Sequence, residues 1–230
     1  MAGKPRLWTV PWGAREAVLA LVGGLVVGAL FVPLVILPFD PEISSKQALL
    51  AAQFLFAATM AAVSILVAAR WKRSGLEGAL PLLGYRPTGL RQLGIALLTL
   101  LAYYAFALLF ASFILEPKQD DIAGELGLGG DSTLLAVLAV AVIVVAAPLA
   151  EEMFFRGMLF AGLRTKFTLW PAAVLSGLAF GIPHVTSGPT AAIPLSVLGI
   201  ALAWLYERTG SIWPCVFAHT INNSIALASS

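Results

Sequence analysis

Seven polar side chains that could take part in chemistry lie within apolar stretches of the C-terminal part of the sequence. Both histidines of the chain are among them. The seven residues are Glu151, Glu152, Arg156, His184, His219, Asn222 and Asn223. Carboxylates and imidazoles are the usual general acids and bases, and amide N–H groups can stabilise a developing oxyanion. Ionisable residues inside membrane helices are costly, so such a set favours a functional site over packing.

Three pairs within this region are spaced four residues apart, which places both members of each pair on one helix face. A basic residue in the first pair could neutralise a buried carboxylate. An aromatic ring in the second could pack beside an imidazole. In the third, two hydrogen-bond donors could point at one place. The pairs are Glu152 with Arg156, Phe180 with His184, and His219 with Asn223.

Two prolines precede these polar groups. Pro148 comes three residues before Glu151, and Pro183 directly precedes His184. A proline inside a helix removes one backbone hydrogen bond, so each should kink its helix and free a carbonyl. Irregular backbone at membrane depth is tolerated where it is buried in protein or lines a wet cavity. The prolines therefore also favour a polar site.

The depths of the polar groups agree. Depth along each helix follows from a rise of about 1.5 Å per residue, measured from Arg164, Trp170 and Arg208 at the predicted cytoplasmic ends of the three helices. Glu151, His184 and His219 then lie roughly 16–21 Å from that side, near the middle of a hydrocarbon core of about 30 Å. Independent packing residues would have no reason to match in depth. The sequence thus predicts one site shared by three helices.

Composition identifies the protein that contains this site as an integral membrane protein. Hydrophobic residues make up 60% of the 230 residues, charged residues only 11%, and the mean hydropathy is +0.92. Continuous apolar runs of this length predict an all-α, polytopic bundle of about seven transmembrane helices. We expect a conical polar site between the fourth, fifth and seventh helices. The longest run is divided by turn-forming residues at 186–190. The charge-free runs are 17–38, 47–69, 92–115, 132–150, 167–206 and 209–230.

Basic residues alternate with the predicted spans in a way that sets orientation. Lysines and arginines near the N-terminus and after the second, fourth and sixth spans predict a cytoplasmic N-terminus and an external C-terminus. They include Lys4, Arg6, Lys72 and Arg73. We expect two parts: residues 1–131, with three helices and an external linker (124–130), and residues 132–230, a helical core with the polar site. The six tryptophans are expected at the membrane interfaces.

The three motifs together resemble a known family. Glu-Glu-x-x-x-Arg at 151–156, Phe-x-x-x-His at 180–184 and His-x-x-x-Asn at 219–223 are similar to the motifs of the CAAX protease and bacteriocin-processing family (CPBP, or Abi). That family includes the type II CAAX prenyl endopeptidases. The resemblance covers about Leu134–Ala226. It implies an intramembrane protease, a hydrolase acting on a peptide bond of a membrane-associated protein or peptide.

Chemistry and resemblance together suggest a role for each residue. Glu151 is expected to be the general base that activates water, and His184 to orient that water. His219 and Asn223 are expected to donate hydrogen bonds to the oxyanion. Glu152, Arg156 and Phe180 are expected to support them.

A metal is not firmly predicted. Two histidines and one glutamate form a ligand set that suits zinc, and members of the family are often classed as metalloendopeptidases. However, no His-Glu-x-x-His motif is present, and the same groups could work with glutamate and water alone. Were a divalent metal such as zinc to bind, its ligands would be Glu151, His184 and His219.

Two other functions remain open: a proton- or ion-coupled transporter, and a non-catalytic immunity or scaffold member of the same fold. No internal repeats are apparent that would favour a transporter. The expected partners are a peptide or protein substrate, with a C-terminal motif or a lipid as alternatives, and the lipid bilayer. No nucleic acid is expected. The expected location is the prokaryotic plasma (inner) membrane, as a multi-pass protein.

Overall fold

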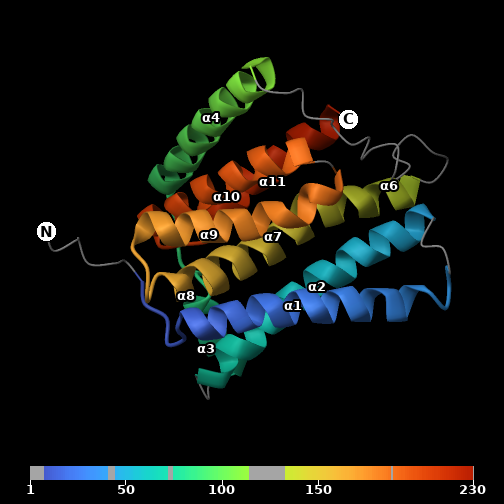
Figure 1. Ribbon diagram of the computed structural model, residues 1–230, viewed down its shortest axis with the longest axis horizontal. Helices are drawn as coiled ribbons and strands as arrows, with labels where there is room; N and C mark the ends of the chain where they lie inside the picture. The colour runs from blue at the N-terminus through green and yellow to red at the C-terminus, as the bar shows by residue number, and fades with distance from the viewer. Residues whose placement is uncertain (1–7, 41–44, 72–74, 114–132, 188, 230) are drawn as a thin grey trace, which may run out of the picture.

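The structure of the protein, a computed structural model, describes residues 8–40, 45–71, 75–113, 133–187 and 189–229. The described residues form helices and connecting turns, and none of them lies in a strand, so the predicted all-α class is confirmed (Figure 1). In chain order the α-helices are α1 (Ala14–Ile36), α2 (Lys46–Trp71), α3 (Gly75–Leu82), α4 (Leu90–Phe113), α6 (Thr133–Val140), α7 (Ala147–Glu152), α8 (Ala161–Leu163), α9 (Leu169–Gly181), α10 (Pro189–Thr209) and α11 (Trp213–Ala228).

Five helical segments in the described residues are long and apolar enough to cross a membrane. They are Ala14–Ile36, Lys46–Arg70, Leu90–Phe113, Thr133–Leu163 and Ala191–Thr209. One shorter apolar helix, Leu169–Val185, and the helix α11 lie among them. The five segments correspond to predicted spans, and the protein is a multi-pass membrane protein, whereas the total of about seven spans stays a prediction. The short helix α3 was not predicted. The last span is shorter than predicted, because α11 begins only after a turn in which Gly210 has φ +68°.

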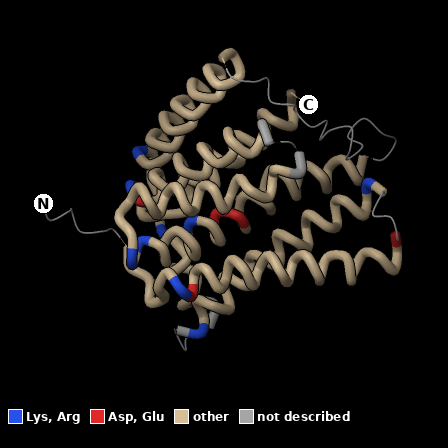
Figure 2. Tube along the Cα trace, viewed as in Figure 1, with Lys and Arg blue, Asp and Glu red and all other residues tan. Residues whose placement is uncertain are grey.

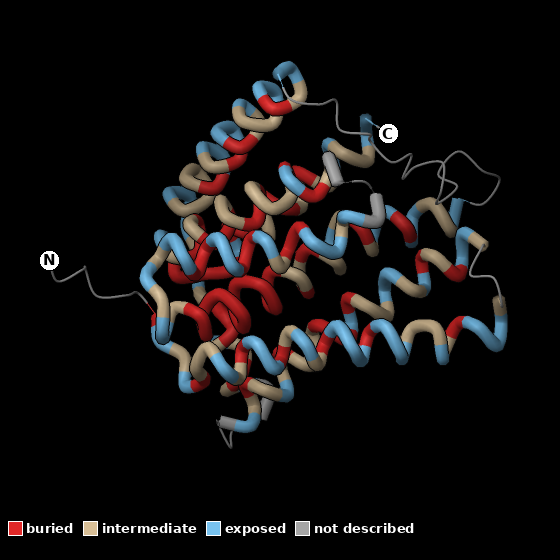
Figure 3. Tube along the Cα trace, viewed as in Figure 1, coloured by how far each residue is buried: buried red, intermediate tan, exposed pale blue. Residues whose placement is uncertain are grey.

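The fourth span is one long rod that contains two π-helical segments. It runs from α6 through η1 (Ala141–Ala146), α7, η2 (Met153–Phe160) and α8. The helix continues beyond the apolar run 132–150 and through the charged run, as predicted. All eight residues of η2 are buried (Figure 3). Because the rod is covered at this point, its charged residues lie inside protein and not against lipid.

Two N-terminal tryptophans help cover this rod, and here the prediction of an interfacial position was wrong. Trp8 and Trp12 are 4% and 1% exposed. The Trp12 Nε1–H donates a hydrogen bond to the Met158 carbonyl at 3.0 Å. Since the indole finds both apolar contacts and an acceptor in η2, burial in protein replaces the membrane interface. Trp170, by contrast, is 59% exposed.

Helices α9 and α10 form a closely packed pair, which small residues permit. A Cβ on Gly181 would lie 2.7 Å from the Ala192 carbonyl oxygen, and one on Gly177 would lie 2.7 Å from the Ser196 carbonyl oxygen. This contact fixes Phe180 on α9 relative to the backbone of α10.

Most described lysines and arginines gather at one end of the bundle (Figure 2). We call it the basic end: α4 and α9 begin there, and α2, α8 and α10 end there. The orientation of this end in the cell stays a prediction. Lys4, Arg6, Lys72, Arg73 and the linker 124–130 lie outside the described residues, as does the predicted boundary at 131/132.

Candidate active site

A fully buried ion pair lies at the centre of the candidate site. Arg156 Nη1 is 2.9 Å from Glu152 Oε1, and both side chains are 0% exposed. Arg156 Nη2 also donates to the Gly199 carbonyl of α10 at 3.2 Å, and the guanidinium lies 4.7 Å from the centre of the Phe180 ring. The predicted pairing is therefore present. It ties the fourth span to α9 and α10.

His219 links this ion pair to Glu151. Its Nδ1 lies 2.8 Å from Glu152 Oε1, and its Nε2 lies 3.8 Å from Glu151 Oε2. A carboxylate beside an arginine is an acceptor only, so His219 Nδ1 must carry a hydrogen and donate it. Its Nε2 is then the nitrogen that faces Glu151.

The two adjacent glutamates differ in access. The side chain of Glu151 is 22% exposed, whereas that of Glu152 is 0% exposed. Glu151 has no hydrogen-bond partner among the described residues, while Glu152 Oε1 accepts from both Arg156 and His219. Glu152 therefore stabilises the contact between helices, and Glu151 is the carboxylate that water or a substrate can contact.

His184 follows α9 in the 3-10 helix η3 (Ile182–Ser187), where Pro183 interrupts the α-helical pattern. Its Nδ1 lies 3.1 Å from the Phe180 carbonyl oxygen, so Nδ1 carries the hydrogen. The Phe180 ring contacts His184 (centroids 5.7 Å apart) and also His219 (5.4 Å apart). Within the described structure no hydrogen bond or ion pair joins His184 to Glu151 or His219. Phe180 is the residue between them.

Asn223 is held from both sides of its amide. Its Nδ2 donates to the Ile143 carbonyl at 3.0 Å, and its Oδ1 accepts from Asn222 Nδ2 at 3.3 Å. Asn222 Oδ1 in turn accepts from the Tyr104 hydroxyl at 3.1 Å. We predicted that His219 and Asn223 donate hydrogen bonds to one point. In the structure one N–H of the Asn223 amide donates to Ile143 instead, which leaves the second N–H for that role.

Two carbonyls of the π-helical segment η1 accept hydrogen bonds from side chains of α11. Pro148 has no N–H to give Val144, and the Val144 carbonyl accepts from Thr220 Oγ1 at 2.8 Å. Asn223 bonds the neighbouring carbonyl of Ile143. The carbonyl predicted to be freed by Pro148 is thus present and satisfied by α11. π-bulges occur frequently at functional sites.

Sequence reasoning did not assign roles to Tyr104 and Thr220. A signal existed for Thr220, which lies between His219 and Asn223 on one helix. For Tyr104 the only signal was a Tyr103-Tyr104 pair in an apolar span, which says nothing about its partner on α11.

The arrangement of these residues does not form a metal site. No group of three or more His, Cys, Asp or Glu side chains in the described part of the chain lies close enough to hold a metal ion. Glu151, His184 and His219 were named as the ligands if a divalent metal binds. These three side chains do not come together, because Phe180 lies between His184 and the other two.

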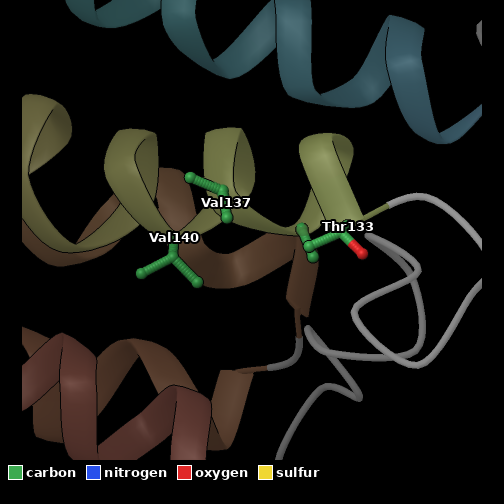
Figure 4. A pocket seen from close by; sticks show the side chains of 4 residues that line it. Thr133, Val137 and Val140 are labelled. Atoms are coloured by element: carbon green, nitrogen blue, oxygen red, sulfur yellow. The ribbon is translucent and has the colours of Figure 1, made fainter.

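A cavity of about 330 Å³ lies on α6, away from the polar groups (Figure 4). It is lined by Thr133, Ala136, Val137 and Val140. None of these side chains titrates, so this cavity offers no acid–base chemistry. The predicted conical shape of the polar site stays a prediction.

Comparison with known proteins agrees with the motifs. Residues 133–225 match the family model described as type II CAAX prenyl endopeptidase Rce1-like. The predicted family resemblance is confirmed at this level.

A relative from Bacillus subtilis (strain 168), named "Putative membrane peptidase YdiL", is 28% identical over 131 residues. The aligned region covers 51% of this chain and 53% of the relative, so the match spans about half the length of that protein. No solved structure matches the chain.

Proposed function

We propose that the protein is an intramembrane endopeptidase in which Glu151 activates a water molecule for attack on a peptide bond. One observation carries the proposal. Of two adjacent glutamates, one is fully buried against Arg156 and His219, and the other is partly exposed with its Oε2 3.8 Å from His219 Nε2. A separation of 3.8 Å is too long for a direct hydrogen bond but allows one water to bond both atoms.

The reaction uses the chain's own groups. Glu151 takes a proton from the water as its oxygen attacks the carbonyl carbon, and the carbonyl oxygen becomes an oxyanion. The donors available to that oxyanion are the second N–H of Asn223 and, when His219 is an imidazolium with Nδ1–H bonded to Glu152, its Nε2–H. Collapse of the intermediate breaks the C–N bond, and Glu151 returns the proton to the leaving amine. His184 Nε2 makes no hydrogen bond within the described residues. Because the Phe180 ring lies between His184 and His219, His184 would orient the attacking water through a further water molecule.

The proposed substrate is a peptide or protein held at the membrane, with a C-terminal sequence motif or an attached lipid as the alternative forms of recognition. The Rce1-like match over residues 133–225 supports this substrate class. We place the protein in the plasma membrane of a prokaryote. The distribution of lysine and arginine favours an orientation with the basic end and the N-terminus in the cytoplasm.

The test compares purified wild-type protein with Glu151→Gln and His219→Ala variants on a peptide library, with Glu77→Gln as the control. Glu77 lies in α3, outside the site. Wild type and Glu77→Gln should cleave equally, and both site variants should lose at least a hundredfold in rate, the scale of general-base catalysis. Full cleavage by both site variants would refute the proposal. Ion flux lost in the variants, without cleavage, would favour a transporter.

A further inference from the structure

A second cavity, of about 680 Å³, lies between α4 and α10, with the first residues of α9 beside it. We call it the α4–α10 groove. Figure 1 shows α4 leaning away from the rest of the bundle. Both helices are predominantly apolar where they line the groove, but two arginines (Arg91 and Arg208) and two tryptophans (Trp170 and Trp204) line it as well.

The α4–α10 groove is separate from the candidate active site. Neither glutamate of the pair and neither histidine lines it. Gly199 of α10, whose carbonyl accepts from Arg156, is also absent from the lining, whereas Val197 and Ala201 take part in it. A ligand in the groove would therefore lie beside α10 without contacting the catalytic groups.

The two arginines are at the basic end, and no acidic side chain among the described residues neutralises their charges. Arg91 is in the first turn of α4, Arg208 is in the last turn of α10, and both are exposed. Neither has an acidic partner in the described structure, whereas the nearby Arg164 pairs with Glu207 at 2.6 Å. The Arg208 guanidinium lies 5.2 Å from the centre of the Trp204 ring. A general excess of arginine on one membrane side does not explain why these two line the same cavity.

The length of the groove suits one leaflet of a membrane. Along α4 its lining runs from Arg91 to Phe106, roughly 22 Å at the rise of an α-helix. Half of a typical hydrocarbon core is about 15 Å, so the groove begins at the interface and reaches to about mid-membrane. Trp170, 59% exposed, and Trp204 lie near its outer part, where tryptophans favour the headgroup level.

We propose that the α4–α10 groove binds one anionic phospholipid of the leaflet at the basic end. Its phosphate lies between Arg91 and Arg208, and one acyl chain lies along Leu98, Ala102 and Phe106 of α4. Basic pockets between membrane helices are suited to such headgroups because guanidinium donors match phosphate oxygens. The other apolar faces of the bundle lack this pair of arginines. The groove should therefore prefer anionic over neutral lipids, and those faces should show no such preference.

The experiment measures quenching of tryptophan fluorescence by lipids with brominated acyl chains, in nanodiscs that hold the full chain. Brominated phosphatidylglycerol is compared with brominated phosphatidylcholine, each titrated into unlabelled phosphatidylcholine. The variants are Arg91→Gln with Arg208→Gln together, and Ala102→Phe, which fills the groove. Their matched controls are Arg70→Gln, an exposed arginine at the same end, and Ala105→Phe, an exposed alanine of α4 outside the groove.

Wild type should prefer the anionic lipid. The double arginine variant should lose about fivefold of that preference for each charge removed. Ala102→Phe should weaken binding of phosphatidylglycerol, whereas Arg70→Gln and Ala105→Phe should leave the preference unchanged. Equal quenching by both lipids in wild type would overturn the proposal. An equal loss in Arg70→Gln would also overturn it, since it would indicate nonspecific surface charge.

Discussion

Arg156 illustrates why a charge can persist inside this membrane protein. Its guanidinium donates one hydrogen bond to Glu152 and one to the Gly199 carbonyl, and it lies 4.7 Å from the centre of the Phe180 ring. Removing one partner of a buried pair leaves the other charge uncompensated. The pair therefore stabilises the junction of three helices as long as both members are present.

Arg156→Gln should lower the free energy of unfolding by about 3–5 kcal/mol, the usual cost of breaking a buried ion pair. The unique cysteine offers a readout, because Cys215 is fully buried and should react with a thiol-specific fluorophore only on unfolding. The melting curve should shift down by several degrees relative to wild type and to Arg70→Gln, an exposed arginine. An unchanged midpoint would mean that the pair contributes nothing to stability.

Tyr104 is predicted to position Asn223 through Asn222. Tyr104→Phe removes the hydroxyl that holds Asn222 Oδ1 at 3.1 Å and leaves the ring in place. If Asn223 contacts the oxyanion, kcat should fall severalfold with KM nearly unchanged, because the contact is made mainly in the transition state. Tyr103→Phe, on the neighbouring residue, is the control. A change in KM alone would assign Tyr104 to substrate binding instead.

At the scale of elements, the fourth span and α11 are joined by carbonyls that a regular α-helix would not expose. Pro148 and the π-helical segment η1 free the carbonyls of Val144 and Ile143, and Thr220 and Asn223 of α11 bond them. The same irregularity that interrupts one helix therefore fixes the register of another.

A double-mutant cycle on Pro148 and Thr220 tests this coupling. Thr220→Val should cost about 1 kcal/mol in the wild-type background, the usual value for a hydrogen bond. In Pro148→Ala the new N–H of residue 148 can satisfy Val144, so the same Thr220→Val change should cost less. Thermal unfolding reported by Cys215 gives the four stabilities. Strictly additive effects would show that the threonine and the proline are independent.

The sequence was informative about elements but not about all of their contacts. Apolar runs predicted the membrane helices, and the four-residue spacing of Glu152 and Arg156 predicted their ion pair, because both depend on local geometry. The hydrogen bond from His219 to Glu152 joins residues 67 positions apart. No helical period indicates which face of α11 meets α7. The sequence likewise did not indicate that Trp12, predicted to be interfacial, packs against η2.

On the scale of the whole molecule, the bundle places its two proposed sites on different sides of α10. The candidate active site lies among the fourth span, α9 and α11, and the α4–α10 groove lies beyond α10. Arg91 and Arg208, which line the groove, lie at the basic end. A lipid bound there would stabilise the position of α4 without entering the active site. Tyr104 of α4 donates a hydrogen bond to Asn222, so this position also affects the asparagines of α11.

The central claim is that Glu151 delivers a water oxygen to a peptide carbonyl, and isotope incorporation tests it most directly. Wild-type protein and Glu151→Gln are incubated with the same peptide library in water enriched in oxygen-18, and the products are analysed by mass spectrometry. Wild type should give products with one oxygen-18 atom in each new C-terminal carboxylate, and Glu151→Gln should give none. Labelled products at wild-type rates from Glu151→Gln would contradict it.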